Sequence, residues 1–177
     1  EPTLLTVSVT GNDASCNGVC DGASAAAEAG GTGPYTYQWD AGGNLETTAA
    51  TTGTLCAGTA GVTVTDAQGC TATGSVFIAE PIAIVLTPAS NDATCGASNG
   101  DVSIVATGGT PGYTFEWMPG NVASLSMTGL PSGSYTFFVT DGNACLDSLI
   151  VNVSSIVGPT LVLDSVTNVS CNGLTDG

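Results

Sequence analysis

The chain has 177 residues, of which 15 are Asp or Glu and none is Lys, Arg or His, so its formal net charge at pH 7 is −15. A surface with only negative charges repels phosphate backbones, which excludes nucleic-acid binding, and it repels anionic lipid headgroups. No run of about 18 apolar residues is present, so no membrane insertion is expected. Disorder is excluded too, because 42% of the residues are hydrophobic and β-branched residues occur in runs.

The same motifs occur two or three times in the same order. The segment NDASCNGVCDG at 12–22 returns as NDATCGASNGD at 91–101 and as NVSCNGLTDG at 168–177. Successive copies are offset by 75 to 79 residues, measured at the pairs Cys16 and Cys95, Trp39 and Trp117, and Cys70 and Cys145. A fixed period of this kind indicates tandem modules.

Module boundaries are expected at two Pro-containing dipeptides, Glu80-Pro81 and Gly158-Pro159, which match the Glu-Pro at the start of the chain. We therefore predict a first repeat at 1–79 and a second at 80–157. Residues 158–177 are expected to be the first strand of a third repeat.

Period-two alternation predicts β-strands throughout each repeat. In 35–39 (YTYQW) the aromatic residues share one face, and 113–117 (YTFEW) repeats that pattern. Residues 23–29 (ASAAAEA) have helical propensity, but they align with the β-branched run VSIVATG, so a strand with a thin, Ala-lined face is predicted. Further strands are predicted at 102–106, 135–140 and 146–153.

These short strands, separated by Gly- and Pro-rich turns, define the predicted fold class. Six or seven strands in fewer than 80 residues, with a Trp on the third strand, are typical of an immunoglobulin-like sandwich. We predict an all-β chain of tandem immunoglobulin-like β-sandwich repeats.

The motif order resembles a known family. Cys-x-Gly, then GGTxxYTYxW, then LPxGxYT, then VTDxxxC is similar to the SprB-type repeat of Bacteroidota cell-surface adhesins. The first repeat departs from the pattern, since Cys56 stands where the second repeat has Pro131. The resemblance implies an extracellular, cell-surface stalk or fibre and supplies no catalytic residue, so we expect no enzyme activity.

Carboxylates are the only charged side chains available for catalysis or metal binding. The Asp residues of the VTD turns are expected to cap those turns through their side chains. The oxygen-rich loops allow a different hypothesis, a calcium site, since Ca²⁺ takes six to eight oxygen ligands. The candidate ligands are Asp13, Asp21, Asp92 and Asp101.

Several side chains are candidates for sugar binding or for glycosylation. Trp39 and Trp117 could form a sugar-binding platform, but burial in the core is the favoured interpretation. Asn152 and Asn168 match the N-linked glycosylation acceptor. Ser148 and Ser165 lie in Asp-Ser-aliphatic triplets, which resemble the O-glycosylation sites of secreted Bacteroidota proteins.

Seven cysteines in a chain without Lys or His indicate disulfides in an oxidising compartment rather than a thiolate metal site. The default within one repeat would join Cys16 to Cys70, and Cys95 to Cys145. In an up-and-down sandwich, however, Cys16 and Cys70 would lie at opposite poles about 20 Å apart, whereas a disulfide needs Cα atoms closer than about 7 Å.

Head-to-tail stacking of repeats would instead bring Cys16 to Cys145. Cys95 and Cys171 would then bond to cysteines of following repeats, and both pairings of Cys16 stay open from the sequence. Cys20 and Cys56, the two extra cysteines of the first repeat, fall at one pole and are expected to pair there.

The functional hypothesis is an extracellular structural or adhesive segment that forms a rigid, disulfide-stapled surface fibre or adhesin stalk. Its expected partners are neighbouring repeats, further copies in lateral or head-to-tail assembly, and surface glycans. The alternative is a carbohydrate- or calcium-binding accessory module of a secreted enzyme.

Overall fold

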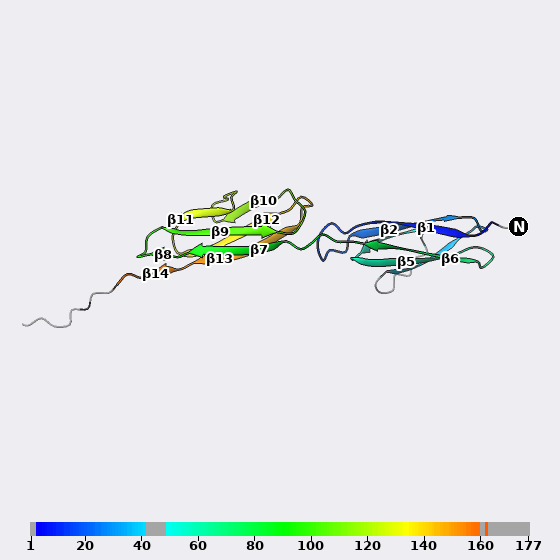
Figure 1. The fold of residues 1–177 in the computed structure, drawn as a ribbon, viewed down its shortest axis with the longest axis horizontal. Coiled ribbons are helices and arrows are strands. Elements are labelled where there is room, and N and C mark those ends of the chain that lie inside the picture. The colour runs from blue at the N-terminus through cyan, green and yellow to red at the C-terminus, as the bar shows by residue number, and fades with distance from the viewer. Residues whose placement is uncertain (1–2, 42–48, 160–161, 163–177) are drawn as a thin grey trace, which may run out of the picture.

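The computed structural model describes residues 3–41, 49–159 and 162, and every regular element in these ranges is a β-strand. The strands form two modules that lie end to end (Figure 1). Module 1 contains β1 (Thr6–Asn12), β2 (Gly22–Ala29), β3 (Thr36–Ala41), β4 (Thr51–Leu55), β5 (Gly58–Thr65) and β6 (Thr71–Ile78). Module 2 contains β7 (Val85–Asn91), β8 (Ala93–Thr94), β9 (Gly100–Thr107), β10 (Thr114–Met118), β11 (Ser126–Leu130), β12 (Gly133–Thr140), β13 (Leu146–Val153) and β14 (Ser155–Ile156).

Each module is a sandwich of two three-stranded antiparallel sheets. The sheets are β1-β2-β4 and β3-β5-β6 in module 1, and β7-β9-β11 and β10-β12-β13 in module 2. Module 2 adds a short parallel pair, β8-β14. The predicted class, tandem immunoglobulin-like β-sandwiches, is confirmed. The predicted third strand at 158–177 lies almost wholly outside the described residues.

The up-and-down connectivity assumed from the sequence is wrong. The chain crosses to the second sheet after β2, returns for β4 and crosses again for β5. This crossing lets the aromatic face of β3 pack opposite the inward face of the first sheet, so that both sheets contribute to one core. The paired strands of the four three-stranded sheets are still antiparallel, so the turns between them stay at the two poles of each module.

Strand β2 has the sequence with the strongest helical propensity, and it is nevertheless a strand, as predicted. It pairs with β1 on one side and β4 on the other, so its backbone groups are satisfied in the sheet. Its inward side chains at Ser24 and Ala26 are small, whereas the matching strand β9 buries Val102 and Ile104. Tertiary pairing therefore outweighs local propensity here.

Each core is built around one Trp on the third long strand of its module. Trp39 is 2% exposed and Trp117 is fully buried. Their indole N–H groups donate to main-chain oxygens, from Trp39 to Ala49 at 3.0 Å and from Trp117 to Ser124 at 2.9 Å. Both rings are core residues, which removes the proposed sugar platform. In the described ranges no helix is long and apolar enough to cross a bilayer.

Candidate functional site

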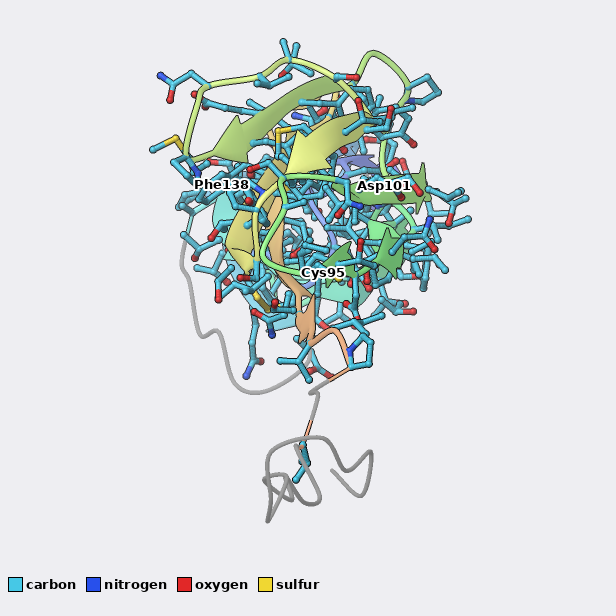
Figure 2. All side chains as sticks on the ribbon, turned by 90° about the vertical axis from the view of Figure 1, so that its left-hand side faces the viewer. Cys95, Asp101 and Phe138 are labelled. Carbon is cyan, nitrogen blue, oxygen red and sulfur yellow. A yellow bond between two sulfur atoms is a disulfide. The ribbon has the colours of Figure 1, made fainter. Side chains whose placement is uncertain are left out.

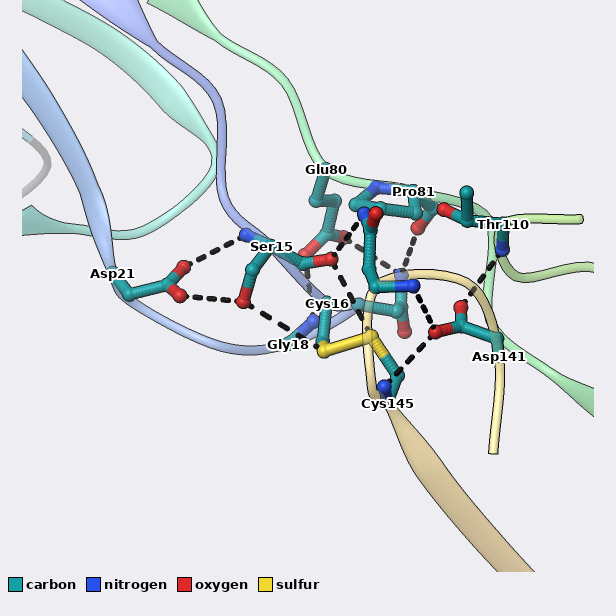
Figure 3. Close-up of a disulfide and its surroundings, with 11 residues drawn as sticks. Ser15, Cys16, Gly18, Asp21, Glu80, Pro81, Thr110, Asp141 and Cys145 are labelled. Carbon is teal, nitrogen blue, oxygen red and sulfur yellow. Dashed lines mark hydrogen bonds between the residues drawn. A yellow bond between two sulfur atoms is a disulfide. The ribbon is translucent and has the colours of Figure 1, made fainter. Parts of the chain in front are cut away.

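The junction between the modules is the most elaborated feature outside the two cores. We define it by three segments: the β1–β2 loop at 13–21, the linker Glu80-Pro81, and the β12–β13 turn at 141–145 (Figure 3). The β1–β2 loop belongs to module 1 and the β12–β13 turn to module 2. The two meet because the modules are stacked with their poles facing.

A disulfide crosses this junction. Cys16 of the loop is bonded to Cys145 of the turn, with Cα atoms 5.7 Å apart and a sequence separation of 129. Cys70 lies on the β5–β6 turn at the opposite pole of module 1, so the structure does not bring it to Cys16. The second disulfide, Cys20–Cys56, lies within module 1 and joins the end of the β1–β2 loop to the residue that follows β4.

The three other cysteines are Cys70, Cys95 and Cys171. Cys70 and Cys95 are exposed and have no disulfide partner among the residues that the structure describes. Cys95 lies at the far end of module 2, where Figure 2 shows it facing the viewer. Cys171 lies outside the described residues.

Hydrogen bonds reinforce the junction around the disulfide. The side-chain amide of Asn143 in module 2 donates to the main-chain oxygen of Ser15 in module 1 at 3.0 Å. The amide of Asn17 donates to the carboxylate of Glu80 at 3.0 Å and to the main-chain oxygen of Pro81 at 3.1 Å. Glu80 also accepts the main-chain N–H of Gly18 at 2.7 Å. The linker is therefore tied to the loop that carries Cys16 (Figure 3).

A carboxylate also fixes the loop from within. Asp21 accepts the main-chain N–H of Ser15 at 2.8 Å and the hydroxyl of the same residue. These bonds to the ionised form, the side-chain one first, hold the pKa of Asp21 below its ordinary value. In module 2 the side-chain oxygen of Asn99 accepts the N–H of Thr94 at 2.8 Å, so an amide replaces the carboxylate.

The turn that carries Cys145 is organised around Asp141, a buried carboxylate. One of its oxygens accepts the N–H of Thr110 at 2.8 Å, and the other accepts those of Asn143 and Cys145, each at 2.9 Å. The bond from Thr110 is the largest cause of a lowered pKa of Asp141. As expected for the VTD motif, the Asp caps its turn.

Asp66 repeats this arrangement at the opposite pole of module 1. It accepts the N–H groups of Thr32 at 3.0 Å, Gln68 at 2.9 Å and Cys70 at 2.8 Å, and its pKa is lowered for the same reason, the bond from Thr32 first. The exposed thiol of Cys70 is therefore on a turn built like the one that presents Cys145.

The four acids considered for calcium are not brought together. Asp13 and Asp21 lie at the junction, whereas Asp92 and Asp101 lie at the far pole of module 2. Asp13 accepts the N–H of Ala79, and Asp92 accepts that of Ser154, each at 2.9 Å. Asp101 accepts the side-chain amide of Asn91. Among the residues described, no three His, Cys, Asp or Glu side chains are grouped to hold a metal ion.

The glycosylation candidates divide between described and undescribed residues. Ser148 and Asn152 are exposed on β13, where the side-chain oxygen of Asn152 accepts the hydroxyl of Ser134 at 2.7 Å. Ser165 and Asn168 lie outside the described residues.

Sequence reasoning missed three residues of the junction, namely Asn17, Glu80 and Asn143. Asn17 precedes a glycine and is typical of a turn, and Glu80 was interpreted only as a boundary. Asn143 follows the VTDG turn, in a position that module 1 fills with Gln68. Both copies of this position carry a side-chain amide that can donate a hydrogen bond, Asn143 and Gln68, and this shared feature could have identified Asn143 from the sequence.

The fold and the junction define a chain of tandem immunoglobulin-like modules with a covalent cross-link between neighbours. Residues 87–122, which run from β7 into the loop after β10, match the family model described as SprB repeat. This match confirms the resemblance of the second repeat to the SprB repeat over this stretch of module 2.

Solved structures to which the chain is similar include those of a cell adhesion molecule, an intimin fragment and a surface layer protein. The N-terminal eight Ig domains of Down Syndrome Cell Adhesion Molecule are 12% identical with a TM-score of 0.40, covering 88% of this chain and 28% of that one. The C-terminal 282-residue fragment of intimin, solved with the translocated intimin receptor's intimin-binding domain, is 13% identical with a TM-score of 0.34, covering 87% and 64%. Surface layer protein SbsC, domains 1–6, is 16% identical with a TM-score of 0.30, covering 90% and 28%. No curated protein matches the sequence.

Proposed function

We propose that the chain is a segment of an extracellular, cell-surface stalk or fibre in which immunoglobulin-like modules are cross-linked to their neighbours. The function is structural or adhesive and involves no catalysis. The observation that carries this proposal is the Cys16–Cys145 disulfide, which joins two modules through loops that both modules possess in equivalent copies.

The exposed cysteines at the outer poles of the two modules support the same kind of cross-link to further repeats. Cys70 sits on a turn hydrogen-bonded like that of Cys145, and its exposed thiol suits a Cys16-type loop of a preceding repeat. Cys95 occupies the Cys16 position of module 2 and suits a Cys145-type turn of a following repeat. In this arrangement Cys171 belongs to the next loop of the series.

Disulfide mapping in the full-length protein from its source cells tests the joint. We expect non-reduced peptides that link Cys70 to an upstream repeat and Cys95 to a downstream one. A bond between Cys70 and Cys95 of different molecules, or free thiols at both, would contradict the serial cross-link.

Surface location is tested separately, with an antibody raised against this chain. We expect it to label intact cells before permeabilisation, and electron microscopy of the purified protein to show straight rods that become kinked after reduction. Labelling only after permeabilisation, or compact particles instead of rods, would contradict a surface stalk.

A further inference from the structure

A groove of about 780 Å³ opens on the outer face of the β10-β12-β13 sheet in module 2. Phe138 of the central strand lies between Glu116 of β10 and Ser148 of β13 in the sheet register. Asn121 and Ala123, from the loop after β10, also line the groove. Figure 2 shows Phe138 on the flank of the module, to one side of Cys95.

Large apolar side chains surround Phe138 on this solvent-facing side. Met118 is 42% exposed, Leu146 is 66% exposed and Ile150 is 62% exposed. The register places Leu146 opposite Thr140, and Ile150 and Met118 on either side of Thr136, so these side chains share the outer face. Clustered apolar side chains on a soluble surface mark an interaction site more often than scattered ones do.

Module 1 provides an internal comparison, because its β3-β5-β6 sheet has the same register. Phe138 corresponds to Thr63, and Glu116 corresponds to Gln38. The positions of Met118, Leu146 and Ile150 are filled in module 1 by Asp40, Thr71 and Ser75. Among the described residues of module 1, the one exposed large apolar side chain on that face is Phe77, which lies at its far end, where module 2 has Asn152.

This difference is not required by the fold, since module 1 forms the same sandwich with a hydrophilic outer face. An apolar outer face also adds nothing to a core on the other side of the sheet. We therefore attribute the apolar face of module 2 to binding.

We propose that this groove docks a segment of a partner protein in which apolar side chains alternate with Lys or Arg. The apolar side chains would contact Phe138 and Met118, and the cation would approach Glu116, the carboxylate that lines the groove. Charge complementarity selects this partner, because the chain has 15 acids and no base anywhere.

The same composition disfavours a second copy of this chain, which has no Lys, Arg or His side chain to bring to Glu116. The groove lining also includes three Thr hydroxyls, Asn121 and Glu116, groups that a sugar would use, so the experiment must distinguish a sugar from a peptide.

The test is chemical-shift mapping on the full chain with three blocked hexapeptides, of alternating Leu and Lys, Leu and Glu, and Ser and Lys. We expect the Leu-Lys peptide alone to shift the outer-face resonances of β10, β12 and β13. Equal binding of the Ser-Lys peptide, or shifts spread over both modules, would mean non-specific charge attraction and overturn the proposal. Shifts produced at the groove by maltoheptaose but not by the Leu-Lys peptide would overturn it in favour of a sugar.

Variants that carry the module 1 residue provide the second readout. Phe138→Thr is expected to weaken Leu-Lys binding by about tenfold or more, as for a central aromatic contact. Glu116→Gln should weaken it severalfold and reduce its salt dependence. Asp40→Asn removes the same charge from the matched face of module 1 and should change the affinity less than about twofold, as for a charge remote from the contact.

A gain-of-function variant completes the test. Gln38→Glu, Asp40→Met and Thr63→Phe together would give module 1 the counterparts of Glu116, Met118 and Phe138, and the stoichiometry should rise from one peptide to two. The Trp39 indole resonance reports whether module 1 remains folded. A folded triple variant that still binds one peptide would overturn the proposal, and if the triple variant unfolds, the mapping and Phe138→Thr decide.

Discussion

The carboxylate of Asp141 accepts the main-chain N–H of Cys145 at 2.9 Å, and so orients the cysteine that is bonded across the module junction. We expect Asp141→Asn to lower the Tm of module 2, because the amide keeps only one oxygen for three N–H donors and turns its own NH₂ toward them. Differential scanning calorimetry measures the change. The control is Asp40→Asn on an exposed strand position, which should leave Tm unchanged; equal Tm values for both variants would contradict the role of Asp141.

Both turn carboxylates make stability depend on acid pH. The pKa values of Asp66 and Asp141 are lowered by main-chain hydrogen bonds in the folded state. Their contribution is therefore fully present above the ordinary Asp pKa, about 3.9, and is lost as pH falls through the lower folded values. We expect Tm to fall progressively below about pH 4. The Asp66→Asn, Asp141→Asn double variant should show a flatter acid limb, and a limb as steep as the wild type's would rule out this assignment.

The two disulfides should have separable effects. Replacing Cys16 and Cys145 by Ser is expected to leave both cores folded but to let the modules tumble more independently, which nitrogen-15 relaxation measures. Replacing Cys20 and Cys56 is the matched control, because that bond lies within module 1. It should destabilise module 1 by about 3–4 kcal/mol, as for a loop of this length, and leave the tumbling unchanged. Identical relaxation in both double variants would contradict the joint.

Gly108 is held in a position that no other residue can occupy. Its φ is +75°, and an added Cβ would lie 1.9 Å from the main-chain oxygen of Ala83. Gly69 has a similar φ of +82° but no atom within 4 Å of that point. Gly69→Ala should cost about 1–2 kcal/mol for the left-handed backbone alone. Gly108→Ala should cost clearly more, or fail to fold; equal losses in chemical denaturation would show that the Ala83 contact is unimportant.

Tyr37 should titrate last among the tyrosines. Its hydroxyl donates to Glu28 at 2.7 Å, and this bond is the main cause that raises the pKa of Tyr37 to about 12. The stability linked to it is present below the ordinary Tyr pKa, about 10, and is lost as pH rises through about 12. Tyr37→Phe copies Phe115 of module 2 and should remove the highest step of an absorbance titration at alkaline pH. Persistence of that step would assign it to another tyrosine.

The sequence was sufficient for most of the fold because the repeat supplied an internal alignment. The matched positions of Trp39 and Trp117 predicted the third strand of each module, and alignment against Val102 outweighed the helical propensity of the Ala-rich strand. The connectivity was not predictable in the same way. Period-two alternation says which face is apolar, but it does not say in which of two sheets a strand pairs.

The module junction was predictable only as far as the order and length of strands and turns along the chain allowed. Placing turns at poles and comparing about 20 Å with the reach of a disulfide kept the pair Cys16 and Cys145 in consideration, and the structure joins these two residues. The hydrogen bonds of Asn143 and Glu80 depend on how two poles dock, and no motif encodes that. The groove around Phe138 was likewise invisible, because a single aromatic on an outer face is unremarkable until the matched face of module 1 is compared.

The Cys16–Cys145 bond determines how a pulling force would pass through the chain. Force applied to the two flanks would run along β1 to Cys16, cross the sulfur atoms to Cys145 and leave along β13. Strands β2 to β6 and β7 to β12, with both Trp residues, lie in the closed covalent loop between these cysteines. Even if both cores unfolded under tension, that loop could not be drawn out while the bond remained intact. The extensibility of the chain would then depend on whether Cys16 and Cys145 are oxidised to a disulfide or reduced to thiols, rather than on the stability of either sandwich.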